Sequence, residues 1–299
     1  MANLKEVRDR ISSVQNTQQI TKAMKMVAAS KLRRAQMAVT QMRPYTNKLN
    51  EMLRNILSNL GGDVNSSFGV ERPVEHACLV VITSDRGLCG AFNTNIIKEA
   101  VAKIERDYKE VRANGNLSIL CVGKKGHEFF RKNYADCKIH ANFVDLFHDL
   151  SFENVSNVSN RLMKAFESGS YDSIAVAYGR FKNPAVQIPE VEQFLPVEKM
   201  EAEGEEDASG ILADYTFEPN KDELLEQLIP DIIKAQFYKY VLDTHASEHG
   251  ARMTAMDAAT ENAGELIKDL RLAYNKARQE AITNQILEIV GGAAALENG

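Results

Sequence analysis

The residues from Pro230 to Ala294 contain no further proline, and only Gly250 and Gly264 interrupt the first sixty of them. Apolar or small residues recur in this stretch at alternating spacings of three and four: Met253, Met256, Thr260, Ala263, Ile267, Leu270, Tyr274, Ala277 and Ala281. This spacing is typical of the seam of a coiled coil. A continuous helix of this length would extend about 90 Å, far beyond the helices of compact domains. We therefore expect it to pack against a partner helix.

The first sixty residues supply that partner. Counted from Leu4, the same alternation of three and four reaches Leu60 without a change of register, and thirteen of its seventeen positions are apolar. They include Val7, Ile11, Val14, Leu32 and Ala35. Because a compact domain returns the chain near its starting point, we predict an antiparallel coiled coil of the two ends. Pro44 either kinks the first helix or ends it near Arg43.

Three consecutive seam positions in the first helix are polar, namely Gln18, Thr21 and Lys25. Polar residues weaken a coiled-coil seam. Two interpretations remain open. The three residues either set the register of the two helices, or they touch something other than the partner helix.

Charge is distributed unevenly along the 299 residues, whose formal net charge is −5. Residues 1–60 carry eleven Lys and Arg against three acidic residues, whereas residues 190–231 carry fourteen Asp and Glu against two lysines. This polarity indicates either separate partners or two solvated faces. The acidic total argues against a nucleic-acid-binding protein. No apolar run reaches the ~20 residues of a membrane span, and the charged start is unlike a secretory signal.

Between the two helices, short β-branched runs alternate with helical stretches. We expect strands at Ala77–Thr83, Leu117–Val122, Lys138–Val144 and Ser173–Tyr178, and helices at Thr94–Val111, from the end of the Gly123–Gly126 turn to Asn133, and at Ser151–Glu167. The alternation predicts a central Rossmann-like, doubly wound α/β domain over residues 75–198. Ala185–Leu195 forms an edge strand or a hairpin. The predicted order is thus an N-terminal helix (1–60), this domain, an acidic loop (199–214) and a C-terminal helix (215–299).

The loops of this sheet do not complete a phosphate-binding motif. Gly87–Gly90 and Gly123–Gly126 are GxxG patterns only. Lys124 and Lys125 either meet a phosphate or lie in a solvated turn. Asp85 and Arg86 either border a ligand site or fix their turn to the neighbouring helices.

Other signs of catalysis are also missing from the sequence. His245 and His249 share a helix face but have no third metal ligand, and the four cysteines have no zinc-site spacing. We read the cysteines as reduced thiols. We therefore expect no catalytic residues, no cofactor and no metal.

The end of the C-terminal helix is apolar on several sides. Ile282, Ile286, Leu287, Ile289 and Val290 point round much of the helix, where the seam runs out. Such an end would be an exposed hydrophobic patch on a monomer. We expect this end either to fold back or to be enclosed by a partner. Enclosure by a partner is the more specific of the two interpretations.

Several stretches in order resemble the gamma subunits of F-type ATP synthases, of the bacterial type. They are Val14–Thr17 with Ile20–Leu32, Thr83–Gly90, Ala251–Asn262, and Tyr274–Gln279 leading to Ile282–Gln285 and Gly291–Ala295. The resemblance implies a non-catalytic rotor shaft, present in one copy, that stands inside a ring of three alpha and three beta subunits. It also implies contact with the epsilon subunit and the membrane c-ring, at the cytoplasmic face of the bacterial inner membrane.

The same resemblance implies roles for individual residues. Contacts with the surrounding ring would be made by Lys22, Met24, Lys25, Lys31, Arg33 and Arg34 in the first helix and by Arg278, Gln279, Thr283 and Gln285 near the tip. Ile286, Leu287, Ile289 and Val290 would form a hydrophobic bearing. This chain departs from the family at Gln285, where a glutamate is usual, and the uncharged glutamine cannot form a salt bridge at that position.

Two rival interpretations are an enzyme that binds a nucleotide in its α/β domain and a coiled-coil scaffold whose basic arm binds nucleic acid. Binding of ATP or NAD to the isolated chain would favour the first. Salt-sensitive retention on DNA would favour the second.

Overall fold

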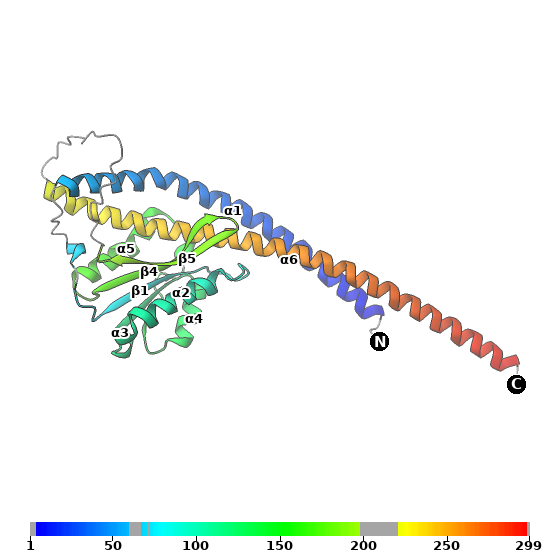
Figure 1. Cartoon of the computed structure of the whole chain (residues 1–299). Helices are drawn as coiled ribbons and strands as arrows, with labels where there is room; N and C mark the ends of the chain where they lie inside the picture. Colours follow the sequence, from blue (N-terminus) through cyan, green and yellow to red (C-terminus); the bar gives the residue numbers. More distant parts are fainter. Residues whose placement is uncertain (1–3, 60–66, 71, 198–220, 298–299) are drawn as a thin grey trace. The chain divides into compact units, whose positions relative to one another are not determined.

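A computed structural model describes residues 4–59, 67–70, 72–197 and 221–297. The chain divides into two compact units. The shaft unit comprises Met1–Ala28 and Met253–Gly299, and the sheet unit comprises Ala29–Arg252. Helix α1 (Leu4–Asn59) and helix α6 (Lys221–Glu297) contribute residues to both units (Figure 1). The predicted acidic loop at 199–214 and the seam position Leu60 lie outside the described residues.

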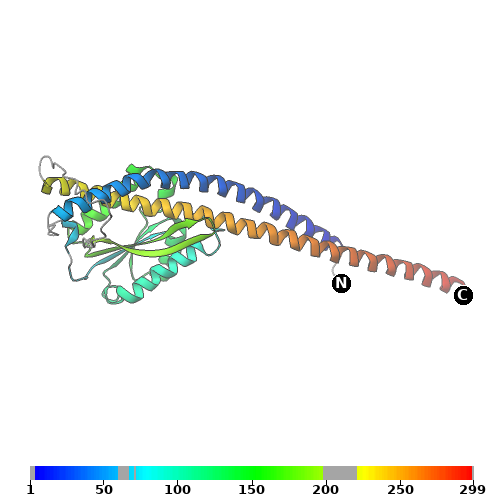
Figure 2. The ribbon, with the colours of Figure 1, turned by 45° about the horizontal axis from the view of Figure 1, so that its top comes forward.

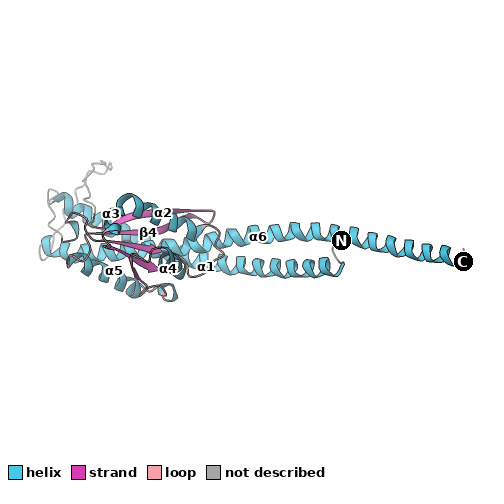
Figure 3. Ribbon diagram, turned by 90° about the horizontal axis from the view of Figure 1, so that it is seen from below, coloured by secondary structure: helices cyan, strands magenta, loops and turns pink. Residues whose placement is uncertain are grey.

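In the shaft unit, the two helices lie side by side and run antiparallel (Figure 3). Thr21 of α1 contacts Thr260 of α6, while Lys25, further along α1, contacts Asp257, which is earlier in α6. Burial follows the spacing of three and four, because only the side facing the other helix is covered. Val7, Thr21 and Ala28 of α1 and Met256, Ala263 and Ile267 of α6 are the buried residues of the seam in this unit. The predicted coiled coil is confirmed.

The sheet unit contains five strands in the order β3-β2-β1-β4-β5. They are β1 (Ala77–Ile82), β2 (Leu117–Val122), β3 (Lys138–His140), β4 (Ser173–Asn183) and β5 (Val186–Leu195). The first four are parallel, and β5 returns from β4 as an antiparallel hairpin at the edge. The central α/β sheet is confirmed, and the hairpin resolves the alternative left open for Ala185–Leu195.

Helices cover both faces of the sheet, as in a doubly wound fold (Figures 1 and 2). On one face, α2 (Phe92–Asp107), α3 (Lys109–Ala113) and α4 (Lys124–Asn133) pack on Leu79, Val81 and their neighbours. On the other, α5 (Phe152–Glu167) and the part of α6 from Ile229 to Val241 pack on Val80, Ile82 and Tyr178. Short 3-10 turns lie at Ser67–Gly69 and Leu146–His148. Alternate residues of each strand therefore feed two separate cores.

Several predicted boundaries are wrong. The helix expected at 94–111 is two helices, because Tyr108 leaves the helical conformation and buries its ring, with its hydroxyl 2.8 Å from that of Ser173. Helix α4 begins at Lys124, so the Gly123–Gly126 segment is a helix start rather than a turn. Strand β3 ends at His140, because it pairs with β2 only over Lys138–His140. At Pro44, where a kink and a helix end near Arg43 were both left open, α1 continues to Asn59 and does not end; α6 likewise contains Pro230.

Candidate functional site

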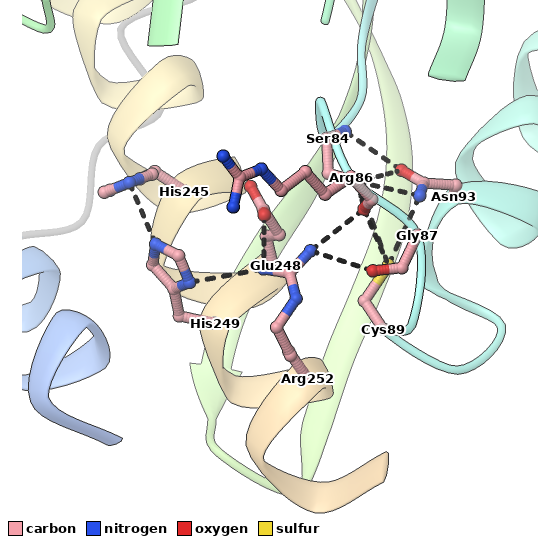
Figure 4. A network of polar contacts seen from close by, with 9 residues as sticks. All are labelled: Ser84, Arg86, Gly87, Cys89, Asn93, His245, Glu248, His249 and Arg252. Atoms are coloured by element: carbon pink, nitrogen blue, oxygen red, sulfur yellow. Dashed lines mark hydrogen bonds and ion pairs between the residues drawn. The ribbon is translucent and has the colours of Figure 1, made fainter. Parts of the chain in front are cut away.

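The turn after β1 is held by a dense set of hydrogen bonds (Figure 4). Ser84 is fully buried; its backbone N–H donates to Asn93 Oδ1 at 2.9 Å, and its hydroxyl donates to the carbonyl of Arg86 at 2.7 Å. The turn includes Leu88, whose φ of 63° is unusual for a residue other than glycine. The Leu88 side chain is 65% exposed. This turn is thus rigid, strained at one residue, and open to solvent at that residue.

Arg252 of α6 fixes the same turn from the other side. Its Nη2 donates to the carbonyl oxygens of Arg86 at 2.9 Å and Gly87 at 3.2 Å, while its Nη1 pairs with Glu248 one helical turn earlier. Burial raises the pKa of Glu248, and the charge of Arg252 opposes that effect. Asp85 accepts a bond from the backbone N–H of Lys124, at the start of α4. These contacts favour the interpretation in which Asp85 and Arg86 fix the turn to neighbouring helices.

His249 is buried and His245 is half-buried, and the two rings form a pair beside Arg252. Their Nε2 atoms are 3.0 Å apart, and Arg252 Nη1 lies 3.4 Å from His249 Nδ1. Since arginine only donates, His249 accepts at Nδ1, donates from Nε2 and leaves His245 as the acceptor at Nε2. Burial, and to a lesser extent the charges of Lys31 and Arg252, lower the pKa of His245 to about 4. Burial also lowers the pKa of His249 to about 3, with smaller contributions from His245, Arg252 and Lys31. Both rings are neutral at pH 7.

Two polar side chains of α6 hydrogen-bond to the backbone of β4 beyond the end of strand β1. The pairing of β1 with β4 ends at Val81 and Ala177, so Gly179 of β4 lies beyond it. The Gly179 N–H donates to Thr244 Oγ1 at 3.3 Å, and its carbonyl accepts from Ser247 Oγ at 3.0 Å. Thr244 and Ser247 are fully buried. These hydroxyls therefore satisfy backbone groups that would otherwise be buried without partners.

One carboxylate joins α6 to the β4–β5 hairpin. Glu192 accepts hydrogen bonds from the hydroxyls of Tyr178 and Tyr240, which belong to β4 and α6. Both tyrosine rings are fully buried. Burial and the adjacent Glu192 raise the pKa of both tyrosines, so they act only as neutral donors. At the hairpin turn, a Cβ on Gly250 would lie 3.3 Å from Pro184, so this glycine of α6 allows close approach.

The glycines of the Gly123–Gly126 segment serve packing. Gly123 has a φ of +93°, and a Cβ there would lie 2.0 Å from the carbonyl oxygen of Thr83. The Gly126 N–H donates to Thr83 Oγ1 at 2.8 Å. The space between these glycines is filled by Thr83, while Lys124 and Lys125 pair with Asp145 and Glu128. The segment is a helix packed closely on β1.

A cavity of about 540 Å³ lies at the opposite end of the sheet, where β1 and β2 begin. Glu75, Arg106, Lys109 and Asn116 are among its lining residues. Ligands of open α/β sheets bind outside the carboxyl ends of the strands, so this position does not favour a nucleotide site.

In the part of the chain that the structure describes, no group of three or more His, Cys, Asp or Glu could hold a metal ion. The four cysteines are free, and burial raises the pKa of Cys78 and of Cys121 to about 12, so these two thiols stay protonated. Among residues 4–59, 67–70, 72–197 and 221–297, no helix is long and apolar enough to cross a bilayer.

The structure places the predicted ring-contact residues on the two helices. Lys22, Lys31, Arg33 and Arg34 are exposed on α1, and Met24 and Lys25 are half-buried. On α6, Arg278, Gln279, Thr283 and Gln285 are all exposed. In the shaft unit, Ile11, Val14, Leu270, Tyr274 and Ala277 are half-buried along the seam, whereas Leu32 and Ala35, in the sheet unit, are buried.

The tip of α6 carries large apolar side chains into solvent. Ile286 is 54% exposed, Leu287 62%, Ile289 72% and Val290 59%. Counting outward from the Thr21–Thr260 contact in steps of three and four places Leu4 of α1 opposite Ala277. From Arg278 onward, α6 therefore extends past Leu4 (Figure 3). The tip does not fold back on the shaft unit.

The sequence did not predict the contacts that join α6 to the sheet through Arg252, Thr244, Ser247 and Glu192. Each of these residues makes at least one hydrogen bond to a residue more than forty positions away. One signal was available: Arg252 and Arg86 both lie in stretches that carry the family resemblance.

The whole chain is similar to known proteins. A family profile described as ATP synthase matches residues 3–296. The chain is 52% identical over 296 residues to the ATP synthase gamma chain of Christiangramia forsetii, covering 99% of each chain. It is 50% identical over 298 residues to that of Cytophaga hutchinsonii, covering 100% of each.

Solved structures share the fold. A chain of the Euglena gracilis mitochondrial ATP synthase, from a structure of OSCP/F1/c-ring, matches with a TM-score of 0.64 at 22% identity, covering 99% of this chain and 95% of that one. A chain of the Tetrahymena thermophila mitochondrial ATP synthase, from a structure of the central stalk and c-ring, matches with a TM-score of 0.54 at 22% identity. That match covers 80% of this chain and 99% of the other.

Proposed function

Because this chain belongs to the ATP synthase gamma-chain family, we propose that it is the central rotor shaft of a rotary ATP synthase. It couples rotation of a membrane c-ring to ATP synthesis, or ATP hydrolysis to ion pumping. The chain itself is non-catalytic, and the catalytic sites belong to beta subunits. It acts by asymmetry: as it turns, it presents a different face to each of three equivalent sites and so biases their nucleotide affinities.

The exposed tip is the observation that carries this proposal. Ile286, Leu287, Ile289 and Val290 are each more than half exposed on a single helix. Monomeric soluble proteins rarely leave such a contiguous apolar patch in water. A ring of three alpha and three beta subunits encloses this tip, and the apolar surface lets the helix turn inside a bearing without fixed polar partners.

Polar residues below the bearing make the directional contacts. Arg278, Gln279, Thr283 and Gln285 project from α6 just beyond the end of α1 and meet loops of the surrounding subunits. Gln285 contributes hydrogen bonds without a charge. On α1, the exposed cations Lys22, Lys31, Arg33 and Arg34 face acidic segments of the beta subunits, with Met24 as adaptable packing beside them.

The remaining partners follow from the same assignment. The sheet unit binds the epsilon subunit and rests on the c-ring, and one copy of the chain serves each complex. Support comes from the matched structures, which are of the OSCP/F1/c-ring of the Euglena gracilis enzyme and of the central stalk and c-ring of the Tetrahymena thermophila enzyme. The chain binds no nucleic acid and has its place at the cytoplasmic face of the bacterial inner membrane, as a peripheral subunit. Its functional divisions are residues 1–60, 75–198, 199–214 and 215–299.

Co-expression with the alpha and beta subunits of the same organism tests this function. We expect the three chains to purify together as a complex that hydrolyses ATP. A chain that elutes alone as a monomer, from cells in which alpha and beta subunits are both present, would contradict the proposal.

A further inference from the structure

The three polar positions in the α1 seam all find partners on α6. Gln18, Thr21 and Lys25 follow one another at spacings of three and four, and the apolar seam resumes at Val14 on one side and Ala28 on the other. Their partners are Gly264, Thr260 and Asp257 in the antiparallel order. We call these six residues the polar layer.

Gln18 and Gly264 form one end of the polar layer. The Gln18 Nε2 donates to the backbone carbonyl of Thr260 at 3.3 Å. That carbonyl lies one helical turn before Gly264, and a Cβ on Gly264 would stand only 3.0 Å from Gln18 Nε2. The missing side chain therefore opens a helix carbonyl to a second donor. This gives a physical reason for a glycine in the middle of a long helix, where glycine is otherwise unfavourable.

Thr21 and Thr260 form the centre. Their hydroxyl oxygens are 2.8 Å apart, and each also lies within hydrogen-bond distance of a carbonyl in its own helix. Thr21 is only 9% exposed, so its hydroxyl needs these partners.

Lys25 and Asp257 form the other end, with Lys25 Nζ 2.5 Å from Asp257 Oδ1. The side chains are 39% and 59% exposed, so solvent weakens their attraction. The pair is still specific, because a shift of α6 by one heptad would leave Lys25 beside Gly264 and Thr21 against Ile267. Apolar positions tolerate such a shift, whereas polar positions do not.

We propose that the polar layer sets the register of α1 and α6, and that Lys25 is a positioning residue within the shaft rather than a contact to the beta subunits. This choice resolves the two interpretations that the sequence leaves open for Gln18, Thr21 and Lys25. The claim that Lys25 does not contact the beta subunits rests on the proposed function. The claim about the register of α1 and α6 involves this chain alone.

Exchanging the two charges tests the role of Lys25. In the full chain, Lys25→Asp and Asp257→Lys each place like charges together, and we expect backbone amide exchange in residues 11–24 to rise about two- to five-fold. The double variant Lys25→Asp/Asp257→Lys restores an ion pair and should return exchange to within about two-fold of wild type. Lys22→Asp, an exposed change one turn away, is the control and should leave exchange unaltered. Additive effects in the double variant would overturn the proposal.

The assembled complex provides a second measurement. If Lys25 acts through Asp257, the double variant Lys25→Asp/Asp257→Lys should restore the ATP-driven pumping that Lys25→Asp alone impairs. If Lys25 instead meets an acidic beta segment, the double variant should remain as impaired as Lys25→Asp, which would overturn the assignment. Failure of the wild-type chain to assemble would count against the proposed function, while the exchange measurement on the free chain would still decide the register.

Cysteine pairs test the register directly, in a chain whose half-buried Cys137 is replaced by Ser. We expect Thr21→Cys/Thr260→Cys to form a disulfide on mild oxidation, and Thr21→Cys/Ile267→Cys, one heptad away, to remain reduced. Equal cross-linking of both pairs would contradict a register set by this layer.

Gly264→Ala should raise amide exchange around Gln18 about five-fold or more, although alanine favours helix. Gly291→Ala, where a Cβ meets nothing within 4 Å, is the matched control and should not.

Discussion

Arg252 Nη2 lies 2.9 Å from the backbone carbonyl oxygen of Arg86, across 166 residues of sequence. The same guanidinium pairs with Glu248, whose side chain is only 9% exposed. One planar group thus neutralises a buried carboxylate and fixes the turn after β1, and a lysine with one compact ammonium cannot do both.

Replacing Arg252 should therefore be among the most damaging single changes in the sheet unit. Arg252→Ala leaves Glu248 buried without its partner, and we expect the free energy of unfolding to fall by about 3–5 kcal/mol. Arg252→Leu with Glu248→Leu should cost less, since no charge remains buried. Arg180→Ala, which removes a partly exposed ion pair with Glu190, is the control and should cost about 1 kcal/mol or less. Urea unfolding measures all three. Equal losses for Arg252→Ala and Arg180→Ala would contradict this role.

The histidine pair should make the chain sensitive to acid. The folded state holds the pKa of His245 at about 4 and that of His249 at about 3, against 6.5 as the ordinary value. The unfolded chain therefore binds protons first. The stabilising contribution of neutral rings is complete above about pH 6.5 and is lost as pH falls toward 4, by up to about 1.4 kcal/mol per histidine for each pH unit.

Urea unfolding at pH 7, 6 and 5 tests this expectation against the variant His245→Gln/His249→Gln. The wild type should lose more stability than the variant between pH 7 and 5. Glu248 acts with the opposite sign, because its raised pKa favours the protonated, folded state in acid, but it is common to both proteins. Parallel curves for the two proteins would show that the pair does not titrate on unfolding.

Two glycines with positive φ should respond differently to alanine. At Gly123, a Cβ would overlap the Thr83 carbonyl at 2.0 Å, and we expect Gly123→Ala to cost more than about 4 kcal/mol or to prevent folding. At Gly115, φ is +73° but nothing lies within 4 Å, so only backbone strain of about 1–2 kcal/mol applies. Thermal unfolding of the two variants separates close packing from strain. Similar melting temperatures would refute the distinction.

Removing residues 286–299 should affect assembly without affecting folding. In this segment, Ile286, Leu287, Ile289 and Val290 are exposed, so their loss removes little buried surface from the free chain. We expect an unchanged melting temperature for the free chain and a weaker complex with alpha and beta subunits. The full-length chain is the control. A truncated chain that forms an equally stable complex would refute the bearing role of the tip.

The overall architecture follows from local patterns, because periodicity alone decides which side of a helix or strand is covered. The alternation of three and four predicts the coiled coil, and β-branched runs predict strands at Leu117–Val122 and near Ala77 and Ser173. Element ends are less predictable. Tyr108 breaks a helix to bury its ring, and β3 stops where its pairing with β2 ends. Both outcomes depend on neighbours that are distant in sequence.

The contacts that hold α6 to the sheet show where sequence reasoning stops. Thr244 and Ser247 read as unremarkable polar residues of a helix, yet both bond the backbone of Gly179, because β1 ends before it. Likewise, Lys25 reads as one cation of a basic arm. Its pairing with Asp257, 232 positions away, emerges only once the register of the two helices is known. Pairings of this kind depend on tertiary structure.

Direct observation of rotation tests the central claim most sharply. The complex of this chain with alpha and beta subunits would be fixed to a surface by its beta subunits, with a probe attached to the sheet unit through an introduced surface cysteine. We predict that ATP drives the probe round in one direction, in steps that repeat three times per turn. A complex that hydrolyses ATP at an undiminished rate while the probe shows only undirected fluctuation would contradict the account of this chain as a rotor.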